Sequence, residues 1–402
     1  MQLKVDGYRV LVPGLVNVHS HSFQRAIRGR TERRSPAGRD SFWTWRDAMY
    51  RAANKLTPED VYHVARMAFL EMLLSGITTV GEFHYLHHAP DGSRYGEPNL
   101  LALQVVRAAQ EVGIRIALLR TAYARSGWQL APNPLQARFI TPSADAFIAD
   151  TEALRHALPG IAIGISPHSI RALPLAYLLE IVSYARRNKL PVHMHVAEQP
   201  AEIEACLAEH RLRPVELLAE HGVLDSSFTA IHAIHITDQE IEMLAAAKAK
   251  VCACPTTERN LGDGVVPAGR LGNAGVEISL GSDSNVQIDL LEDARSLEYD
   301  LRMAKLERAI LRPEALMTSL TRAGQLALGL LDQPNDYFTL DLRDPSIAGA
   351  DPESLLPTIL FSANRAAVRD VSVNGQRVIE NGRHPLQDEI VREFHSVCRR
   401  LL

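Results

Sequence analysis

Two histidines, His19 and His21, stand two positions apart near the start of this 402-residue chain. They follow a run of apolar residues that is typical of a β-strand, and side chains at positions i and i+2 of a strand point to the same face. The imidazole nitrogen is a common ligand of zinc. The pair could therefore supply two ligands to one metal ion, although such a pair is not specific when it stands alone.

Three further apolar segments end in polar residues that could take part in the same chemistry. His195, which could be a third ligand, is followed by Glu198, which could carry protons or belong to a solvated loop. His232 could act in a site or be a hydrogen-bonded core histidine. Asp283 could bind a metal and accept a proton from bound water, or it could cap a helix.

A regular alternation of strand and helix patterns places these residues. Near-continuous apolar runs are typical of parallel strands that are buried on both faces. They predict strands at residues 10–21, 77–85, 115–124, 161–169, 191–198, 229–235, 251–258 and 277–284. Helical spacing of apolar residues predicts helices at 57–75, 99–113, 175–188, 201–206, 238–247, 290–306 and 313–329. Eight strand–helix units predict an α/β fold, a (β/α)8 TIM barrel.

The joint placement of the candidate residues is more specific than any one of them. They follow the first, fifth, sixth and eighth predicted strands, and therefore lie on the face of a barrel where active sites form. Three imidazoles and one carboxylate, with a position left open for water, are typical of a catalytic zinc site. The sequence therefore predicts a catalytic metal site.

The ends of the chain differ from its middle. Both carry short β patterns, and Asn374-Gly375 is a dipeptide typical of a two-residue hairpin turn. We expect a small β-sandwich domain made from residues 1–12 and 338–390, beside a barrel made from residues 13–337.

Composition narrows the class of protein. Apolar residues make up 46% of the chain, charged residues make up 22%, and the net charge is −4. These values are ordinary for a soluble enzyme, and they give no basic surface for nucleic acid. We find no apolar run long enough for a membrane span and no secretory leader, so we expect a cytoplasmic protein. The four sparse cysteines fit a reducing compartment, and we interpret Cys252 and Cys254 as core residues.

The segment from residue 22 to residue 56 is long for a loop between a strand and a helix, and such loops are often functional. It carries Trp43 and Trp45, which could line a pocket or pack the loop. Its basic cluster is interpreted as solvated surface, and the members are Arg25, Arg28, Arg30, Arg33 and Arg34.

Taken together, the motifs resemble those of the amidohydrolase superfamily. The resemblance is carried by residues 13–21, His195-x-x-Glu198, His232 and Gly281-Ser282-Asp283-Ser284. Nearly the whole chain also resembles the formimidoylglutamate deiminases of histidine degradation, most distinctively at residues 23–26, 42–50, 82–88, 167–172 and 257–264.

This resemblance implies an activity and a set of site residues. The implied reaction is the zinc-dependent hydrolysis of N-formimidoyl-L-glutamate to N-formyl-L-glutamate and ammonia by a homodimer, with iron or manganese as alternative metals. The implied metal ligands are His19, His21, His195 and Asp283. The implied catalytic residues are Glu198, His232 and Asp283. The implied substrate contacts are Gln24, Arg46, Tyr85, His168 and Arg171.

The implied substrate is an amidine that carries two carboxylates, and guanidinium groups bind carboxylates in a two-pronged geometry. Arg171 follows the fourth predicted strand and Arg46 lies in the long loop, so both could reach a ligand or form surface salt bridges instead. A related enzyme that deaminates a purine or guanine-like ring would not need two arginines. A barrel that only binds a metal would not need Glu198, His232 and Asp283 to converge.

Overall fold

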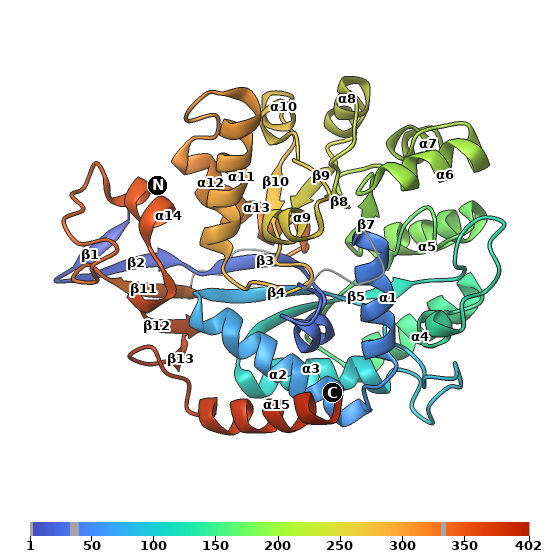
Figure 1. Ribbon diagram of the computed structural model, residues 1–402, viewed down its shortest axis with the longest axis horizontal. Helices are drawn as coiled ribbons and strands as arrows, with labels where there is room; N and C mark the ends of the chain where they lie inside the picture. Colours follow the sequence, from blue (N-terminus) through green and yellow to red (C-terminus); the bar gives the residue numbers. More distant parts are fainter. Residues whose placement is uncertain (1–2, 33–39, 331–334, 402) are drawn as a thin grey trace.

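Eight parallel strands curve into a nearly closed barrel with helices outside it, in a computed structural model that describes residues 3–32, 40–330 and 335–401 (Figure 1). The strands pair in the order β10-β9-β8-β7-β6-β5-β4-β3. Their bounds are β3 (Leu15–Ser20), β4 (Ile77–His84), β5 (Arg115–Ala122), β6 (Ala162–Pro167), β7 (Val192–Val196), β8 (Phe228–His232), β9 (Lys250–Ala253) and β10 (Ile278–Leu280). The predicted (β/α)8 fold is confirmed.

Backbone hydrogen bonds just beyond β10 close the barrel against β3. The amide of Asp283 donates to the carbonyl of His19 at 2.9 Å, and the amide of His21 donates to the carbonyl of Asp283 at 3.0 Å. The first and last strands therefore meet at residues that the sequence nominates as metal ligands.

Ten α-helices surround the barrel in the described residues between 58 and 305. The sequence predicts six of them, and it does not predict those at residues 144–157, 214–220, 255–261 and 268–273. The ten helices are α2 (Pro58–Leu74), α3 (Leu100–Val112), α4 (Ala144–Ala157), α5 (Leu175–Arg187), α6 (Pro200–His210), α7 (Pro214–Glu220), α8 (Asp238–Ala246), α9 (Pro255–Leu261), α10 (Ala268–Asn273) and α11 (Leu290–Lys305). The predicted helix at 313–329 is wrong as a single element, because non-helical backbone at Thr321 divides it into α12 (Pro313–Leu320) and α13 (Arg322–Ala327).

Both ends of the chain contribute to one antiparallel sheet, with the order β1-β2-β11-β12-β13. Its strands are β1 (Lys4–Asp6), β2 (Arg9–Pro13), β11 (Tyr337–Asp341), β12 (Val368–Val373) and β13 (Gln376–Ile379). The predicted turn is present, since Asn374 and Gly375 both have positive φ, 54° and 76°. The predicted β structure from the two termini is confirmed, but in the described residues it is a single five-stranded sheet and not the two packed sheets of the predicted sandwich.

The first predicted barrel strand, residues 10–21, is also wrong as a single element. Its first part belongs to β2 in the small sheet and its second part to β3 in the barrel. Pro13 has no amide hydrogen to continue a ladder. Gly14 packs closely against the barrel, since a Cβ at this position would lie 2.2 Å from Oγ1 of Thr78. The chain therefore changes sheets at Pro13-Gly14.

The small sheet and the barrel share one apolar core, which includes Val10 and Phe338 of the sheet as well as Leu15 and Ile77 of the barrel. The division into a small β domain, residues 1–12 and 338–390, and a barrel domain, residues 13–337, stays a prediction.

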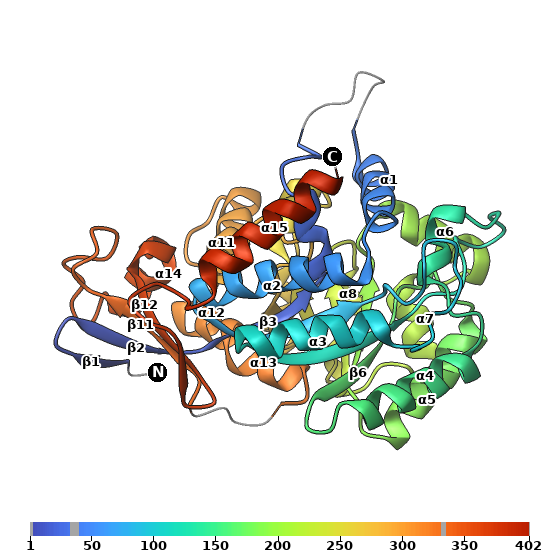
Figure 2. The same ribbon diagram turned by 90° about the horizontal axis from the view of Figure 1, so that it is seen from below.

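Six further helices complete the described part of the chain: three lie between barrel strands and three belong to its C-terminal part. They are η1 (Ser22–Ile27), α1 (Phe42–Ala53), η2 (Pro134–Phe139), α14 (Leu355–Ser362), η3 (Arg365–Ala367) and α15 (Gln387–Leu401). The C-terminal helix α15 runs along α2 on the outside of the barrel (Figure 2). None of the helices in the described ranges combines the length and the apolar character that a membrane span requires.

Candidate active site

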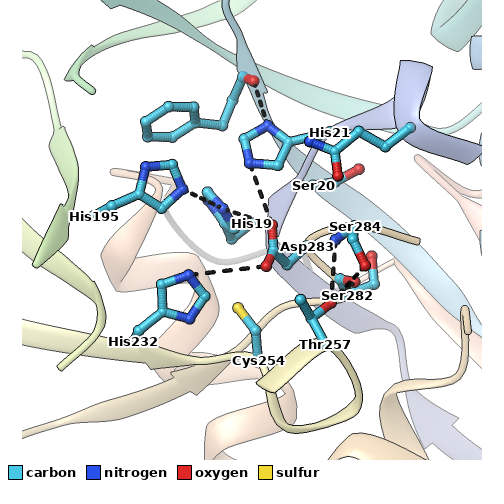
Figure 3. A network of polar contacts seen from close by, with 12 residues as sticks. His19, Ser20, His21, His195, His232, Cys254, Thr257, Ser282, Asp283 and Ser284 are labelled. Atoms are coloured by element: carbon cyan, nitrogen blue, oxygen red, sulfur yellow. Dashed lines mark hydrogen bonds and ion pairs between the residues drawn. The ribbon is translucent and has the colours of Figure 1, made fainter. Parts of the chain in front are cut away.

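The four predicted metal ligands converge at the C-terminal ends of the barrel strands (Figure 3). The Nε2 atoms of His19 and His21 lie 3.3 Å and 3.2 Å from Oδ1 of Asp283. Nε2 of His195 lies 3.2 Å from Nε2 of His19. All four residues are buried, and one ligand atom from each lies within 4.8 Å of the others.

Backbone carbonyls orient two of the imidazoles. Nδ1 of His21 donates to the carbonyl of Phe83 at 2.9 Å, and Nδ1 of His195 donates to the carbonyl of His168 at 2.9 Å. A carbonyl can only accept, so each ring presents the lone pair of Nε2 to the cluster. Such outer contacts are typical of histidines that bind metals.

The protonation states fit a metal site. Burial lowers the pKa of His19 to about 3 and the pKa of His195 well below its usual range, so both rings stay neutral, as ligands must be. Burial alone would raise the pKa of Asp283, but the contacts with His19 and His21 hold it well below its usual range. Three imidazole nitrogens and one ionised carboxylate therefore provide a donor set that suits zinc, and also iron or manganese.

His232 stands beside this cluster in a ring of carboxyl groups. Its Nδ1 donates to Oε1 of Glu258 at 3.1 Å, and its Nε2 lies 3.8 Å from both Oε1 of Glu198 and Oδ2 of Asp283. Burial opposes a charged imidazole, but Glu198, Glu258 and Asp283 together raise the pKa of His232 well above its usual value. His232 therefore holds a proton next to Asp283 and is not a core histidine.

The structure adds Glu258, to which no role was assigned from the sequence. The predicted strand 251–258 ends with it, but β9 is shorter and Glu258 lies in α9. Its Oε1 accepts from the amide of Cys254 at 2.8 Å as well as from His232. The signal in the sequence was an acidic residue at the end of a predicted strand, since Glu258 ends the predicted strand 251–258 as Glu198 ends the predicted strand 191–198.

A cavity opens beside the ligand cluster, as expected for a site that binds a small molecule. All five predicted substrate contacts line it: Gln24, Arg46, Tyr85, His168 and Arg171. It is also lined by residues that the sequence did not nominate, among them Phe42, Met49, Tyr50, Glu202 and Leu261.

Helix α1, which lies within the long segment after β3, forms one wall of this cavity. Trp43 and Trp45 both line the cavity. The guanidinium of Arg46 lies 4.5 Å from the ring centre of Trp43 and 5.5 Å from that of Tyr50. The position of this helix over the site could not be read from the sequence, since it depends on contacts between segments far apart in the chain.

Two guanidinium groups, those of Arg46 and Arg171, face the cavity. Arg171 lies 3.5 Å from the phenol oxygen of Tyr123 and 3.4 Å from the carbonyl of Ser126. Within residues 3–32, 40–330 and 335–401, neither Arg46 nor Arg171 forms an ion pair with a side-chain carboxylate. The surface salt bridges that were the alternative for these residues are thus absent from the described residues, and both cations can bind an anionic ligand.

The prediction that the arginine cluster is solvated surface is wrong for two of its members. Arg25 and Arg28 bind Glu71 of α2 at 2.9 Å and 2.6 Å, and Nε of Arg28 donates to the carbonyl of Asn285 at 2.9 Å. These side chains fasten η1 to α2 and to the loop that carries Asp283. Arg33 and Arg34 lie outside the described residues.

The fold and the site together define the class of protein. The model of the Amidohydrolase family matches residues 10–378, and the chain belongs to this family. Within it, the chain is 37% identical to a formimidoylglutamate deiminase of Pseudomonas aeruginosa, over 98% of this chain and 89% of that protein. It is 28% identical to a 5-methylthioadenosine/S-adenosylhomocysteine deaminase of Thermodesulfovibrio yellowstonii, over 96% and 83% of the two chains.

Solved structures agree with this placement. A crystal structure of an amidohydrolase from Brucella melitensis matches with a TM-score of 0.90 and 35% identity, covering 99% of this chain and 95% of that one. An adenosine deaminase from Xanthomonas campestris with bound zinc shares the fold, with a TM-score of 0.83 at 21% identity, covering 98% and 86% of the two chains. The chain is therefore a hydrolytic enzyme that cleaves carbon–nitrogen bonds, and the predicted resemblance is confirmed.

Proposed function

We propose that this enzyme hydrolyses N-formimidoyl-L-glutamate to N-formyl-L-glutamate and ammonia, as a step of histidine degradation. The observation that carries the proposal is the pair of guanidinium groups, Arg46 and Arg171, that face the cavity without carboxylate partners. A substrate with two carboxylates satisfies both cations. The 37% identity to a formimidoylglutamate deiminase supports the same substrate.

We propose that one zinc ion per chain is held by His19, His21, His195 and Asp283, whose ligand atoms cluster within 4.8 Å. When bound, the metal acts as a Lewis acid that makes a water molecule nucleophilic near neutral pH.

The proton transfers fall to three side chains. Oδ1 of Asp283 faces the ligand histidines, while Oδ2 lies on the side of His232, so Oδ2 is free to accept the proton of the attacking water. His232, which holds a proton, stabilises negative charge that develops on the attacking oxygen. Burial raises the pKa of Glu198, which allows its carboxyl group to donate a proton to the departing nitrogen.

These transfers balance the reaction. Water adds to the amidine carbon, and both of its protons pass to the terminal nitrogen through Glu198: the first is the proton taken up by Asp283, and the second is released when the hydroxyl becomes the formyl carbonyl. The bond from the carbon to that nitrogen breaks and ammonia leaves, which returns Asp283 and Glu198 to their starting states. General acid–base catalysis of this kind contributes about 10²- to 10⁴-fold in rate.

The other cavity residues are proposed to contact the amidine end of the substrate. The ring of Tyr85 lies 5.0 Å from that of His21, and the ring of His168 lies 4.9 Å from that of His195. Nε2 of Gln24 donates to the phenol oxygen of Tyr85 at 2.8 Å, which holds both polar groups beside the reacting carbon.

The test is the release of ammonia from N-formimidoyl-L-glutamate by the zinc-loaded enzyme and by Arg171→Met. Loss of charged hydrogen bonds to a carboxylate is expected to lower kcat/KM by roughly 10- to 100-fold. Arg377→Met, at an exposed position on β13, is the control and should match the unaltered enzyme. No ammonia release from a metal-loaded enzyme would overturn the substrate while leaving the family assignment intact.

The second candidate is the deamination of a purine, a guanine-like ring or another aromatic amine, which the 28% identity to a 5-methylthioadenosine/S-adenosylhomocysteine deaminase favours. A neutral ring has no carboxylate for Arg46 and Arg171 to bind. Activity on 5-methylthioadenosine and none on the amidine diacid would establish this alternative.

We also propose that the enzyme acts in the cytoplasm as a homodimer on its small-molecule substrate, without a nucleic acid or membrane partner. The four cysteines are free thiols, as expected in a reducing compartment. They are Cys206, Cys252, Cys254 and Cys398. Sedimentation equilibrium of the purified enzyme measures the assembly state.

A further inference from the structure

Cys254 occupies an unusual place for a core residue. It directly follows β9, its side chain is 0% exposed, and it contacts the apolar cluster inside the barrel. Its sulfur also lies near two functional groups, because one ligand atom from each of His232, Cys254 and Asp283 lies within 4.8 Å of the other two. Figure 3 shows the sulfur between the His232 ring and the Asp283 carboxylate.

The two oxygens of Asp283 serve different sides of the site. Oδ1 lies 3.3 Å and 3.2 Å from the Nε2 atoms of His19 and His21. Oδ2 points the other way and lies 3.8 Å from Nε2 of His232. A carboxylate in this position can bridge two cations, one on the side of the histidine cluster and one on the side of His232 and Cys254.

The charge around this second position favours a cation. Oε1 of Glu198 lies 3.8 Å from Nε2 of His232, and Oε1 of Glu258 lies 3.1 Å from Nδ1. Three buried carboxyl groups therefore surround one imidazole, and a dication that takes the place of its proton keeps positive charge among them.

We propose that His232, Cys254 and Asp283 form a second metal site that takes thiophilic divalent cations, such as zinc in excess or cadmium, and inhibits the enzyme. A thiolate ligand selects soft cations over magnesium or calcium. Binding would displace the protons of the Cys254 thiol and of Nε2 of His232, since ligands must be deprotonated.

Occupation of this site stops catalysis for a geometric reason. The cation would sit between Nε2 of His232 and Oδ2 of Asp283. The proposed mechanism needs a proton on Nε2 of His232 and a free Oδ2 of Asp283 that accepts the proton of the attacking water, and the cation would occupy both atoms. The expected inhibition rests on the proposed roles of these two residues, whereas the expected binding does not.

The binding test adds cadmium to enzyme that already holds one equivalent of zinc, and follows the ultraviolet charge-transfer absorption of a cadmium–thiolate bond. We expect the absorption to rise with added cadmium and saturate at one equivalent per chain. Cys254→Ser should lack this absorption. Cys206→Ser, which changes a buried cysteine on α6 that belongs to neither ligand cluster, is the matched control and should retain it.

Two outcomes would overturn the site. One is the absence of thiolate absorption in the unaltered enzyme, a result that needs no variant to fold. The other is absorption that persists in Cys254→Ser, because the sulfur ligand would then be another cysteine. Neither readout uses a substrate, so a wrong substrate assignment leaves this test unaffected.

The inhibition test measures ammonia release as zinc is raised above one equivalent, with each variant normalised to its own rate at one equivalent. Even loss of an outer-shell partner costs about 10- to 100-fold in metal affinity, so the zinc concentration for half-inhibition should rise at least about tenfold in Cys254→Ser. Cys206→Ser should be inhibited like the unaltered enzyme, and magnesium should not inhibit. Equal zinc inhibition in Cys254→Ser and in the unaltered enzyme would contradict the proposal.

Discussion

Glu258 is one of the three carboxyl groups that hold the proton on His232, and it lies outside the proposed set of metal ligands. Glu258 accepts from Nδ1 of His232 at 3.1 Å, and its charge helps to raise the pKa of the imidazole after burial has opposed it. If catalysis needs protonated His232, activity is lost as the pH rises through that pKa.

Replacement of Glu258 should therefore move the alkaline limb of the pH–rate profile. In Glu258→Gln one negative charge is removed, the pKa of His232 falls, and the limb of kcat should shift to lower pH. We expect kcat at neutral pH to fall by roughly 10- to 100-fold, as for other partners that orient catalytic imidazoles. The exposed substitution Glu204→Gln on α6 is the control. An unchanged profile in Glu258→Gln would remove Glu258 from the mechanism.

Glu198 gives a second test at a single residue. In Glu198→Gln the four metal ligands are intact, so the metal content should stay near one per chain. Turnover should fall by about 10²- to 10⁴-fold, the usual contribution of a general acid or base. Metal analysis beside kcat separates the two effects, and unchanged turnover would show that another group protonates the leaving nitrogen.

The chemical roles of single residues could be predicted from the sequence better than the backbone conformation that these residues adopt. His19, His21 and Asp283 follow apolar runs, and that pattern was enough to place them at strand ends. The positive φ of His232 and Asp283, 71° and 46°, could not be predicted, because non-glycine residues adopt it at a cost of roughly 1–3 kcal/mol. The strain is sustained by surrounding contacts, such as the amide of Ser282 that donates to buried Asn17 at 3.0 Å.

Among the elements, the change of sheets between β2 and β3 was hidden by a continuous apolar pattern. Val10, Val12 and Leu15 are all buried, so burial alone gives no sign of a boundary. Only the Pro13-Gly14 pair marks it, and the reason for the glycine is a close approach to Thr78 that belongs to a distant segment.

That approach predicts a loss of stability on adding one methyl group. Gly14→Ala places a carbon 2.2 Å from Oγ1 of Thr78, and such overpacking typically costs about 1–3 kcal/mol. Urea unfolding should show this decrease in the free energy of unfolding. Gly96→Ala, which meets no atom within 4 Å, should change it by less than about 0.5 kcal/mol. Equal stability of the two variants would mean that the junction can relax.

For the whole molecule, buried acids make stability depend on pH. Burial raises the pKa of Glu82 from 4.5 to about 7, with the contacts to Ser22 lowering it in part. Between these values the unfolded chain has lost the proton that the folded chain keeps. Stability is therefore highest below 4.5 for this group and falls as the pH rises to about 7.

Glu82→Gln should flatten that dependence. The amide keeps an oxygen to accept from Ser22, whose amide lies 2.7 Å from Oε1 of Glu82, but it has no proton to lose. Urea unfolding of the metal-free protein at about pH 5 and pH 7 should show a fall of up to roughly 3 kcal/mol in the unaltered chain and a smaller fall in the variant. An identical fall in both would assign the dependence to other groups.

The barrel as a whole was predictable because its eight apolar runs and intervening helices are local patterns. The cavity was not, because its wall comes from α1, and the approach of Arg46 to a point near Arg171 reflects packing between segments far apart in the chain.

The closure of the barrel through the proposed metal ligands also sets the order of events during synthesis. Asn285 donates to the carbonyl of His21 from 264 positions away, and Asp283 lies beside it. At about 5–20 residues per second, a ribosome needs roughly 10–50 s to reach Asn285 after it has added His21. Until then the nascent chain holds two histidines without their carboxylate. A metal ion that needs all four proposed ligands can therefore bind only late, when the fold is complete.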